Sequence, residues 1–142
     1  SAGRSRPVGV TVDLDLVDLL GRYVSDPVQQ ASQRNEVIQW QMRSRAFVLT
    51  QRRMGEEARG GAAPGAATSM FKLYGASLAQ DQQSLTADLM GSQGMGWEDA
   101  GFLPEELGAT RSWLASRAVT IYGGTNEVQA NIIAKRVLGL PD

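Results

Sequence analysis

Apolar side chains recur at three- and four-residue spacing near the start of the chain, which predicts an amphipathic helix over about residues 11–24. Its apolar face consists of Leu16, Leu19, Leu20 and Tyr23 or Val24. Thr11 is the expected N-cap, and Asp13 and Asp15 suit the positive end of the helix dipole. Residues 1–10 hold two glycines, a proline and two arginines without periodicity, so we expect a flexible lead-in there.

A second, much longer helix is predicted over residues 27–59. Asp26 can cap it, and Pro27 fits the first helical position, where a backbone N–H has no helical partner to lose. Two neighbouring apolar stripes run along it: one consists of Ala31, Ile38, Met42, Ala46 and Leu49, the other of Trp40, Phe47 and Met54. We interpret the Trp40 stripe as core or as a subunit contact. A helix of about 48 Å suits a helical bundle.

Clusters of glycine and proline divide the rest of the chain. Residues 60–65 form a clear break, and Gly91 can end the helix that follows in the left-handed conformation. Four glycines make residues 91–103 a predicted loop. Asn126 is the expected cap of the last helix, with Gln129 three residues later. The three further helices are predicted over 66–90, 104–120 and 126–138, and the side chains expected to be buried in the fourth are Trp113, Leu114 and Ala118.

These patterns predict an all-α protein, because no segment shows the alternation of a strand. The expected architecture is an up-and-down four-helix bundle with an additional C-terminal helix, formed by residues 11–142 after the lead-in.

The residue types that the chain lacks limit its chemistry. It has 142 residues with no cysteine and no histidine, so disulfides, thiolate nucleophiles, zinc–thiolate sites, iron–sulfur clusters, histidine metal ligands and Ser-His-Asp triads are excluded, and no metal site is expected. Its net charge of −1 gives no indication of nucleic-acid binding. No segment has the apolar length of a membrane span, and the first residues lack the apolar core of a signal peptide, so we expect a cytoplasmic protein.

Two glycine-rich turns are candidates for ligand contact. In residues 121–129, two glycines allow a close approach to the backbone, and the N–H groups of the following helix start favour an oxyanion or a phosphate oxygen. An ordinary capped loop between two helices is the alternative. Residues 90–94 form a second glycine loop, for which a simple helix end is the alternative.

The stretch IYGGTNEVQANIIAKRVLGLP, residues 121–141, closely resembles the C-terminal signature of the acyl-CoA dehydrogenase family. The stretch DLMGSQGM, residues 88–95, resembles the helix and glycine loop with which that family meets the flavin of a neighbouring subunit. From about residue 11 onward the chain looks like the family's C-terminal helical domain. The resemblance implies FAD, an acyl-CoA substrate, a homo- or hetero-oligomer (a dimer or tetramer), and α,β-dehydrogenation with hydride transfer to the flavin.

The resemblance also implies roles for individual residues. Gly123 occupies the position of the catalytic Glu in many members, so no catalytic base is expected within this chain. The implied substrate-binding residues are Tyr122, Gly123 and Gly124, and the implied cofactor-binding residues are Thr125, Glu127, Gly91 and Ser92. Three positions depart from the family pattern: Ser92 replaces a Gly, Asp88 stands where a Gln is frequent, and Arg22 is out of register with an Arg that meets the flavin pyrophosphate.

Two hypotheses follow. The chain is the C-terminal domain of a flavin-dependent acyl-CoA dehydrogenase, inactive as an isolated fragment, whose base lies on an earlier helix. Alternatively, it is a non-catalytic helical module that supplies half of an interface to a catalytic partner in an unequal-subunit complex.

Overall fold

The computed structural model describes residues 14–61, 67–98 and 100–141, and within these ranges it contains helices and no strands. The all-α prediction is therefore confirmed, while the lead-in and the expected Thr11 cap lie outside the described residues. The five helices are α1 (Leu16–Tyr23), α2 (Pro27–Arg59), α3 (Ala67–Met90), α4 (Pro104–Ser116) and α5 (Asn126–Ile132). Shorter helical turns are η1 (Gly91–Met95), η2 (Arg117–Thr120) and the π-helical η3 (Ile133–Val137).

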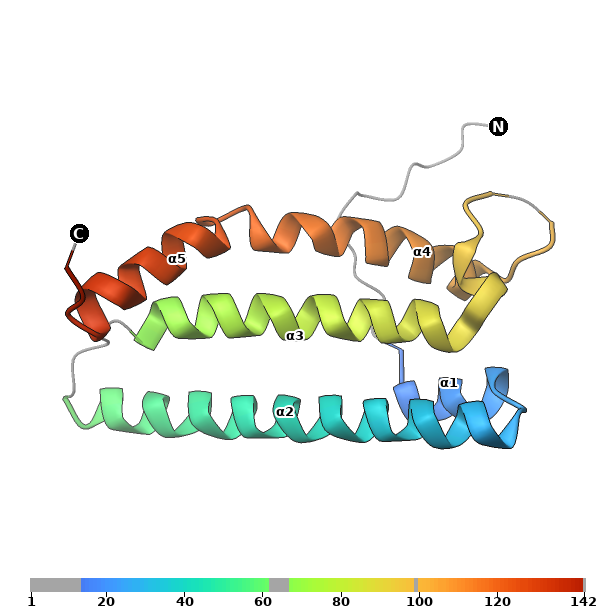
Figure 1. Cartoon of the computed structure of the whole chain (residues 1–142), viewed down its shortest axis with the longest axis horizontal. Coiled ribbons are helices and arrows are strands. Elements are labelled where there is room, and N and C mark those ends of the chain that lie inside the picture. Colours follow the sequence, from blue (N-terminus) through green and yellow to red (C-terminus); the bar gives the residue numbers. More distant parts are fainter. Residues whose placement is uncertain (1–13, 62–66, 99, 142) are drawn as a thin grey trace.

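Helix α3 lies in the middle of the molecule and contacts each of the other helices. Figure 1 shows α2 antiparallel to it on one side, with α4 and α5 following one another along its other side. The short helix α1 lies at the end of the bundle where α2 begins and α3 finishes. This arrangement makes α3 the common support of every segment that the sequence marks as a candidate site.

The start of α1 differs from the prediction. The helix begins at Leu16, and its N-cap is Asp15 rather than Thr11. The Asp15 carboxylate accepts hydrogen bonds from the backbone N–H groups of Val17 and Asp18. These two N–H groups have no partner within the helix, so the carboxylate stabilises a helix start at Leu16. The predicted apolar face is confirmed, because Leu16, Leu19, Leu20 and Val24 are all buried in the main core.

Helix α2 is capped as predicted, since the Asp26 carboxylate accepts a hydrogen bond from the N–H of Gln29 and Pro27 holds the first position. Its inner face is the Trp40 stripe: Trp40, Phe47 and Met54 are partly buried. The Trp40 indole N–H donates to the carbonyl oxygen of Leu78 on α3 at 2.9 Å. The other predicted stripe is the outer one, with Ile38, Met42 and Leu49 exposed by 44–61%.

Helix α4 packs through small residues, which corrects the predicted burial. Its buried positions are Ala109, Ser112, Ser116 and Glu106, whereas Leu114 is 48% exposed, Ala118 is exposed and Trp113 is partly buried. Small side chains let the α4 backbone lie close to α3, and bulky ones at the same positions would hold the helices apart. Apart from Glu106, the side chains that α4 buries are therefore small ones, and two of the three are polar.

The segment predicted as a loop over 91–103 begins with a 3-10 turn, η1. Gly91 has φ +57°, so it ends α3 in the predicted left-handed conformation. Gly94 is buried, and a Cβ there would lie 2.7 Å from the carbonyl oxygen of Ala87. The glycines that suggested a loop thus allow a tight helical turn to pack against the end of α3.

Candidate functional site

The segment 121–125 is a sharp turn between η2 and α5. Gly123 and Gly124 have φ values of +71° and +99°, which L-residues with a side chain rarely adopt. A Cβ on Gly124 would also lie 2.6 Å from the side-chain nitrogen of Gln129. Tyr122 is 61% exposed and Gly123 is exposed, so the outside of the turn is open to a ligand.

The N-cap of α5 lies one residue before the predicted one, and the helix begins at Asn126 itself. Its N-cap is Thr125 rather than Asn126, because the Thr125 hydroxyl accepts a hydrogen bond from the N–H of Val128 at 3.3 Å. The extended backbone of Thr125 follows directly from the two left-handed glycines, so the turn geometry decides which residue caps. Glu127 is exposed in the first turn, and Asn126 Oδ1 is buried without a hydrogen-bond partner.

Lys72 of α3 contacts the residues on either side of the start of this turn, a role that the sequence alone did not reveal. Its ammonium donates a hydrogen bond to the carbonyl oxygen of Val119 at 2.7 Å and lies 5.7 Å from the centre of the Tyr122 ring. A Cβ on Gly123 would be 3.6 Å from Lys72 Cε. A lysine in the middle of a helical pattern carries no local signal, since its partners lie about 50 residues further along the chain.

Gly91 and Ser92 lie at the opposite end of α3. Both are exposed, and they follow the last residue of the helix, whereas Lys72 and the 121–125 turn lie near its first residues. The 24 residues of α3 span about 36 Å. One chain therefore does not bring the predicted cofactor residues Gly91 and Ser92 together with Thr125 and Glu127.

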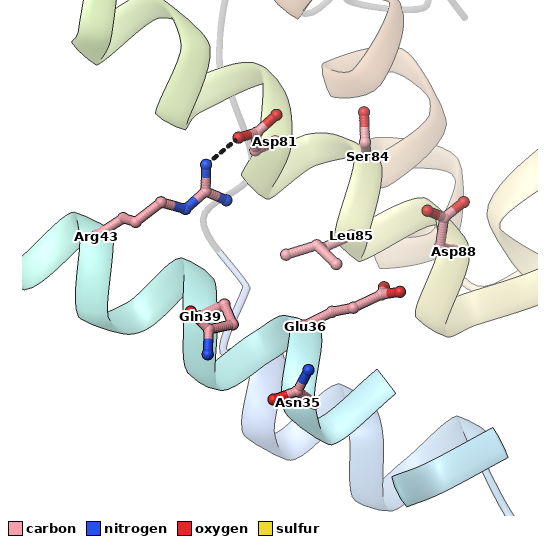
Figure 2. Close-up of a pocket in the computed structure, with 8 residues that line it drawn as sticks. All are labelled: Asn35, Glu36, Gln39, Arg43, Asp81, Ser84, Leu85 and Asp88. Carbon is pink, nitrogen blue, oxygen red and sulfur yellow. Dashed lines mark hydrogen bonds and ion pairs between the residues drawn. The ribbon is translucent and has the colours of Figure 1, made fainter. Parts of the chain in front are cut away.

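Two adjoining hollows follow the face of α3 near Gly91. Figure 2 shows the first, about 330 Å³, between α2 and α3, with Arg43 paired to Asp81 at 2.9 Å. The second is about 750 Å³ and reaches from α2 across α3 to α4; it is lined by residues that include Gln33, Glu36, Asp88, Gly91, Trp113 and Leu114. The two hollows share Glu36 and Asp88 among their lining residues, so they adjoin at these carboxylates, and the second hollow is called the Gly91 groove below.

Arg22 is engaged in ion pairs at the start of the bundle. Its guanidinium donates to Glu105 of α4 and to Asp18 one helical turn before it, and the hydrogen bond to Glu105, followed by the one to Asp18, raises its pKa above its ordinary value. Two carboxylates, one from α1 and one from α4, therefore hold Arg22 at the junction of these helices.

Tyr23 and Glu106 connect α1 to α4. The Tyr23 hydroxyl donates to one carboxylate oxygen of Glu106 at 2.8 Å, and the other oxygen accepts from the N–H of Leu103 at 2.7 Å. Burial, and next the hydrogen bond to Glu106, raise the pKa of Tyr23 to about 12. Glu106 is 4% exposed and is a structural carboxylate: one oxygen joins α4 to α1, and the other satisfies the N-cap backbone of α4 itself.

A flavin would meet different conditions at the two ends of α3. At the 121–125 turn, open glycine backbone beside a lysine and a helix start fits a phosphate or carbonyl oxygen. At the Gly91 end the groove presents Glu36 and Asp88 and no basic lining residue among those described, which does not fit an anionic diphosphate. Within the described ranges there is no group of three potential metal-binding side chains and no helix long and apolar enough to cross a membrane.

Comparisons with known proteins identify relatives. The family model described as "Acyl-CoA dehydrogenase, C-terminal domain" matches residues 21–138. Acyl-CoA dehydrogenase FadE34 of Mycobacterium tuberculosis is 35% identical over 127 residues, which are 89% of this chain and 16% of that protein. Acyl-CoA dehydrogenase IpdE1 of the same organism is 46% identical over 73 residues, which are 51% of this chain and 18% of that protein.

A solved structure shares the fold. A chain in the crystal structure of the ChsE4-ChsE5 complex from Mycobacterium tuberculosis superposes with a TM-score of 0.69 at 22% identity. The match covers 89% of this chain and 36% of that one. The chain thus spans less than one fifth of the curated relatives it matches and about a third of the solved one.

Proposed function

Because this chain belongs to the acyl-CoA dehydrogenase family as a C-terminal domain, we propose that it is the helical domain of a flavin-dependent acyl-CoA dehydrogenase and is inactive by itself. The observation that carries the proposal is the left-handed turn at Gly123 and Gly124, which lies beside Lys72 and directly before the cap of α5, with Gly123 exposed. The flavin, when bound, would supply the acceptor for a hydride.

The turn residues would bind and orient the acyl thioester rather than take its proton. The N–H of Gly123 is a candidate hydrogen-bond donor to the thioester carbonyl oxygen, where negative charge develops as the α-proton leaves. Exposed Tyr122 would cover the acyl group beside it, and Thr125 and Glu127 would face the flavin nucleotide. Gly123 has no side chain to act as a base, and Glu106 is committed to Tyr23 and Leu103. The base would therefore come from outside this chain.

The experiment uses the full protein that carries this domain. Flavin content per subunit is read from the absorption spectrum, and flavin reduction by acyl-CoA is followed anaerobically by stopped flow. Changing Glu127, or Glu98, which is exposed in the loop after η1, to Gln should leave the reduction rate per bound flavin within a few fold of wild type if the base lies elsewhere. Loss of reduction with flavin still bound in either variant would place the base inside this domain and contradict the proposal.

A second candidate is a non-catalytic helical subunit in an unequal-subunit complex. The acidic groove at Gly91 favours it, because a domain that does not fit a flavin diphosphate there would leave catalysis to its partner. The fold relative named above was solved as a complex of two proteins, ChsE4 and ChsE5. A flavin-to-chain ratio near one half in the purified assembly would select this candidate over the first.

A further inference from the structure

The groove at the Gly91 end of α3 presents hydrogen-bond acceptors at its centre. Glu36 comes from α2 and Asp88 from α3, both are exposed, and neither takes part in an ion pair within the described residues. The side-chain oxygen of Gln33 is buried in the same groove and has no hydrogen-bond partner. Arg43, in the adjoining hollow, is already paired with Asp81. The groove is thus short of donors and of positive charge.

The walls of the groove are apolar around these acceptors. Leu114 is 48% exposed and Met95 80% exposed, and Trp113 is partly buried between α4 and α3. A volume of about 750 Å³ is within the usual range of ligand sites. Apolar walls with a negative centre match a long side chain that has an aliphatic stem and a cationic head. A guanidinium also has five donors, enough to serve two carboxylates together.

We propose that this groove binds an arginine side chain presented between apolar residues by a segment of a partner protein. The same charges disfavour a nucleotide diphosphate, because each phosphate would lie beside carboxylates with no basic lining residue to offset them. The inference does not depend on the proposed dehydrogenase reaction, which concerns the turn at the other end of α3. Each proposal can fail without the other.

The test uses two short peptides and the chain with its tryptophans labelled for NMR. The peptides are acetyl-Leu-Arg-Leu-Leu-amide and the same sequence with citrulline, the uncharged counterpart of arginine. The reporter is the indole N–H signal of Trp113, assigned with Trp113→Phe. In low salt the arginine peptide should shift this signal and bind at least about fivefold more tightly than the citrulline peptide, the effect of a partly exposed ion pair.

Two double variants identify the carboxylates responsible. Glu36→Gln with Asp88→Asn should remove the preference for arginine, whereas Glu56→Gln with Glu57→Gln makes the same change of charge at the far end of α2 and should keep it. Both pairs are on the surface, and unchanged circular dichroism checks that the fold is kept. ADP is the competing anionic ligand. Equal binding of the two peptides, no binding of either, or a Trp113 shift with ADP in the wild-type chain would each overturn the proposal.

Discussion

The ammonium of Lys72 lies 2.7 Å from the carbonyl oxygen of Val119, and this contact joins the first third of α3 to the end of η2. The carbonyl belongs to the last turn before Tyr122 and the two left-handed glycines, where helix carbonyls have no helical partner. A cation there satisfies the carbonyl and the negative end of the helix dipole together. The contact therefore holds the segment just before the glycine turn against α3.

Replacing Lys72 with Met should loosen the glycine turn without unfolding the bundle. The aliphatic stem is kept, while the hydrogen bond to Val119 is lost at a cost of about 1 kcal/mol. Amide exchange over residues 121–125 should speed up by roughly fivefold, with exchange in α1 unchanged. Lys72→Arg keeps a charged donor and serves as the matched control. Equal exchange in wild type and Lys72→Met would show that the contact does not hold the turn.

Replacing Gly124 with Ala should destabilise the chain. At φ +99° a side chain strains the backbone by about 1–3 kcal/mol, and Gln129 would have to move as well. Gly21→Ala is the control, because Gly21 is helical with open space around its Cβ position. That change should raise the free energy of unfolding by about 0.5–1 kcal/mol. Urea unfolding measures both, and an equal effect of the two substitutions would refute the argument.

Replacing Tyr23 with Phe should weaken the junction of α1 and α4. The buried Glu106 carboxylate loses one of its two hydrogen bonds, which costs about 1.5–3 kcal/mol for a charged acceptor. Tyr122→Phe removes a hydroxyl from an exposed residue and should change stability by less than about 0.5 kcal/mol. A double-mutant cycle with Glu106→Gln isolates the pair, and a coupling energy near zero would contradict it.

Tyr23 should also make stability fall at alkaline pH. Its pKa is about 12 in the folded chain and about 10 when unfolded, so the native state holds its proton more tightly. The stabilisation is complete below pH 10 and is lost as the pH rises through 12. Unfolding measured from pH 9 to 12 should show a steeper decline in wild type than in Tyr23→Phe. Parallel curves for the two proteins would show that this tyrosine is not the responsible group.

The outer stripe of α2 should drive self-association of the chain. Ile38, Met42 and Leu49 lie on one helical face and are 44%, 61% and 50% exposed. Replacing all three with Gln should shift light-scattering masses toward the monomer, because exposed apolar patches promote association. The matching replacement of Val17, Val28 and Val48, which are also exposed but do not share that face, should leave association in place. An unchanged mass in the first variant would point to another contact surface.

Local chemistry in the sequence predicted the helices well. The start of α2 depends on Asp26 and Pro27, which are neighbours in the sequence. The buried face of α1 depends on the spacing of Leu16, Leu19 and Leu20, so the local sequence contains the information that determines both helices. The order of the helices and the left-handed Gly91 were predicted for the same reason.

The choice between adjacent faces could not be read from the sequence. On α2 both stripes are apolar, and the one that lies inward is the one whose Trp40 donates to Leu78 of α3. On α4 the closeness of α3 selects Ala109, Ser112 and Ser116 over the larger Trp113 and Leu114. These outcomes depend on neighbours far along the chain.

The sequence predicted the residue types of the candidate site better than their arrangement in space. The glycine turn and its open backbone followed from the sequence, whereas the cap moved from Asn126 to Thr125 because two left-handed residues precede it. Lys72, Gln33 and Glu36 were missed, since each acquires its neighbours through the packing of different helices. The roles of Gly91, Ser92, Thr125 and Glu127 toward a flavin stay predictions.

Because of the length of α3, any ligand that has to contact both ends of this helix should bind with an apparent affinity that depends on the protein concentration. The glycine turn lies against Lys72, and the 19 residues from Lys72 to Gly91 span about 28 Å of helix, so a ligand shorter than this cannot touch both within one chain. Such a ligand would have to bridge two protein molecules, so by mass action its occupancy would fall on dilution even with the ligand in excess. Titrations at nanomolar and at micromolar chain would then give different apparent affinities, and that difference would itself report shared occupancy.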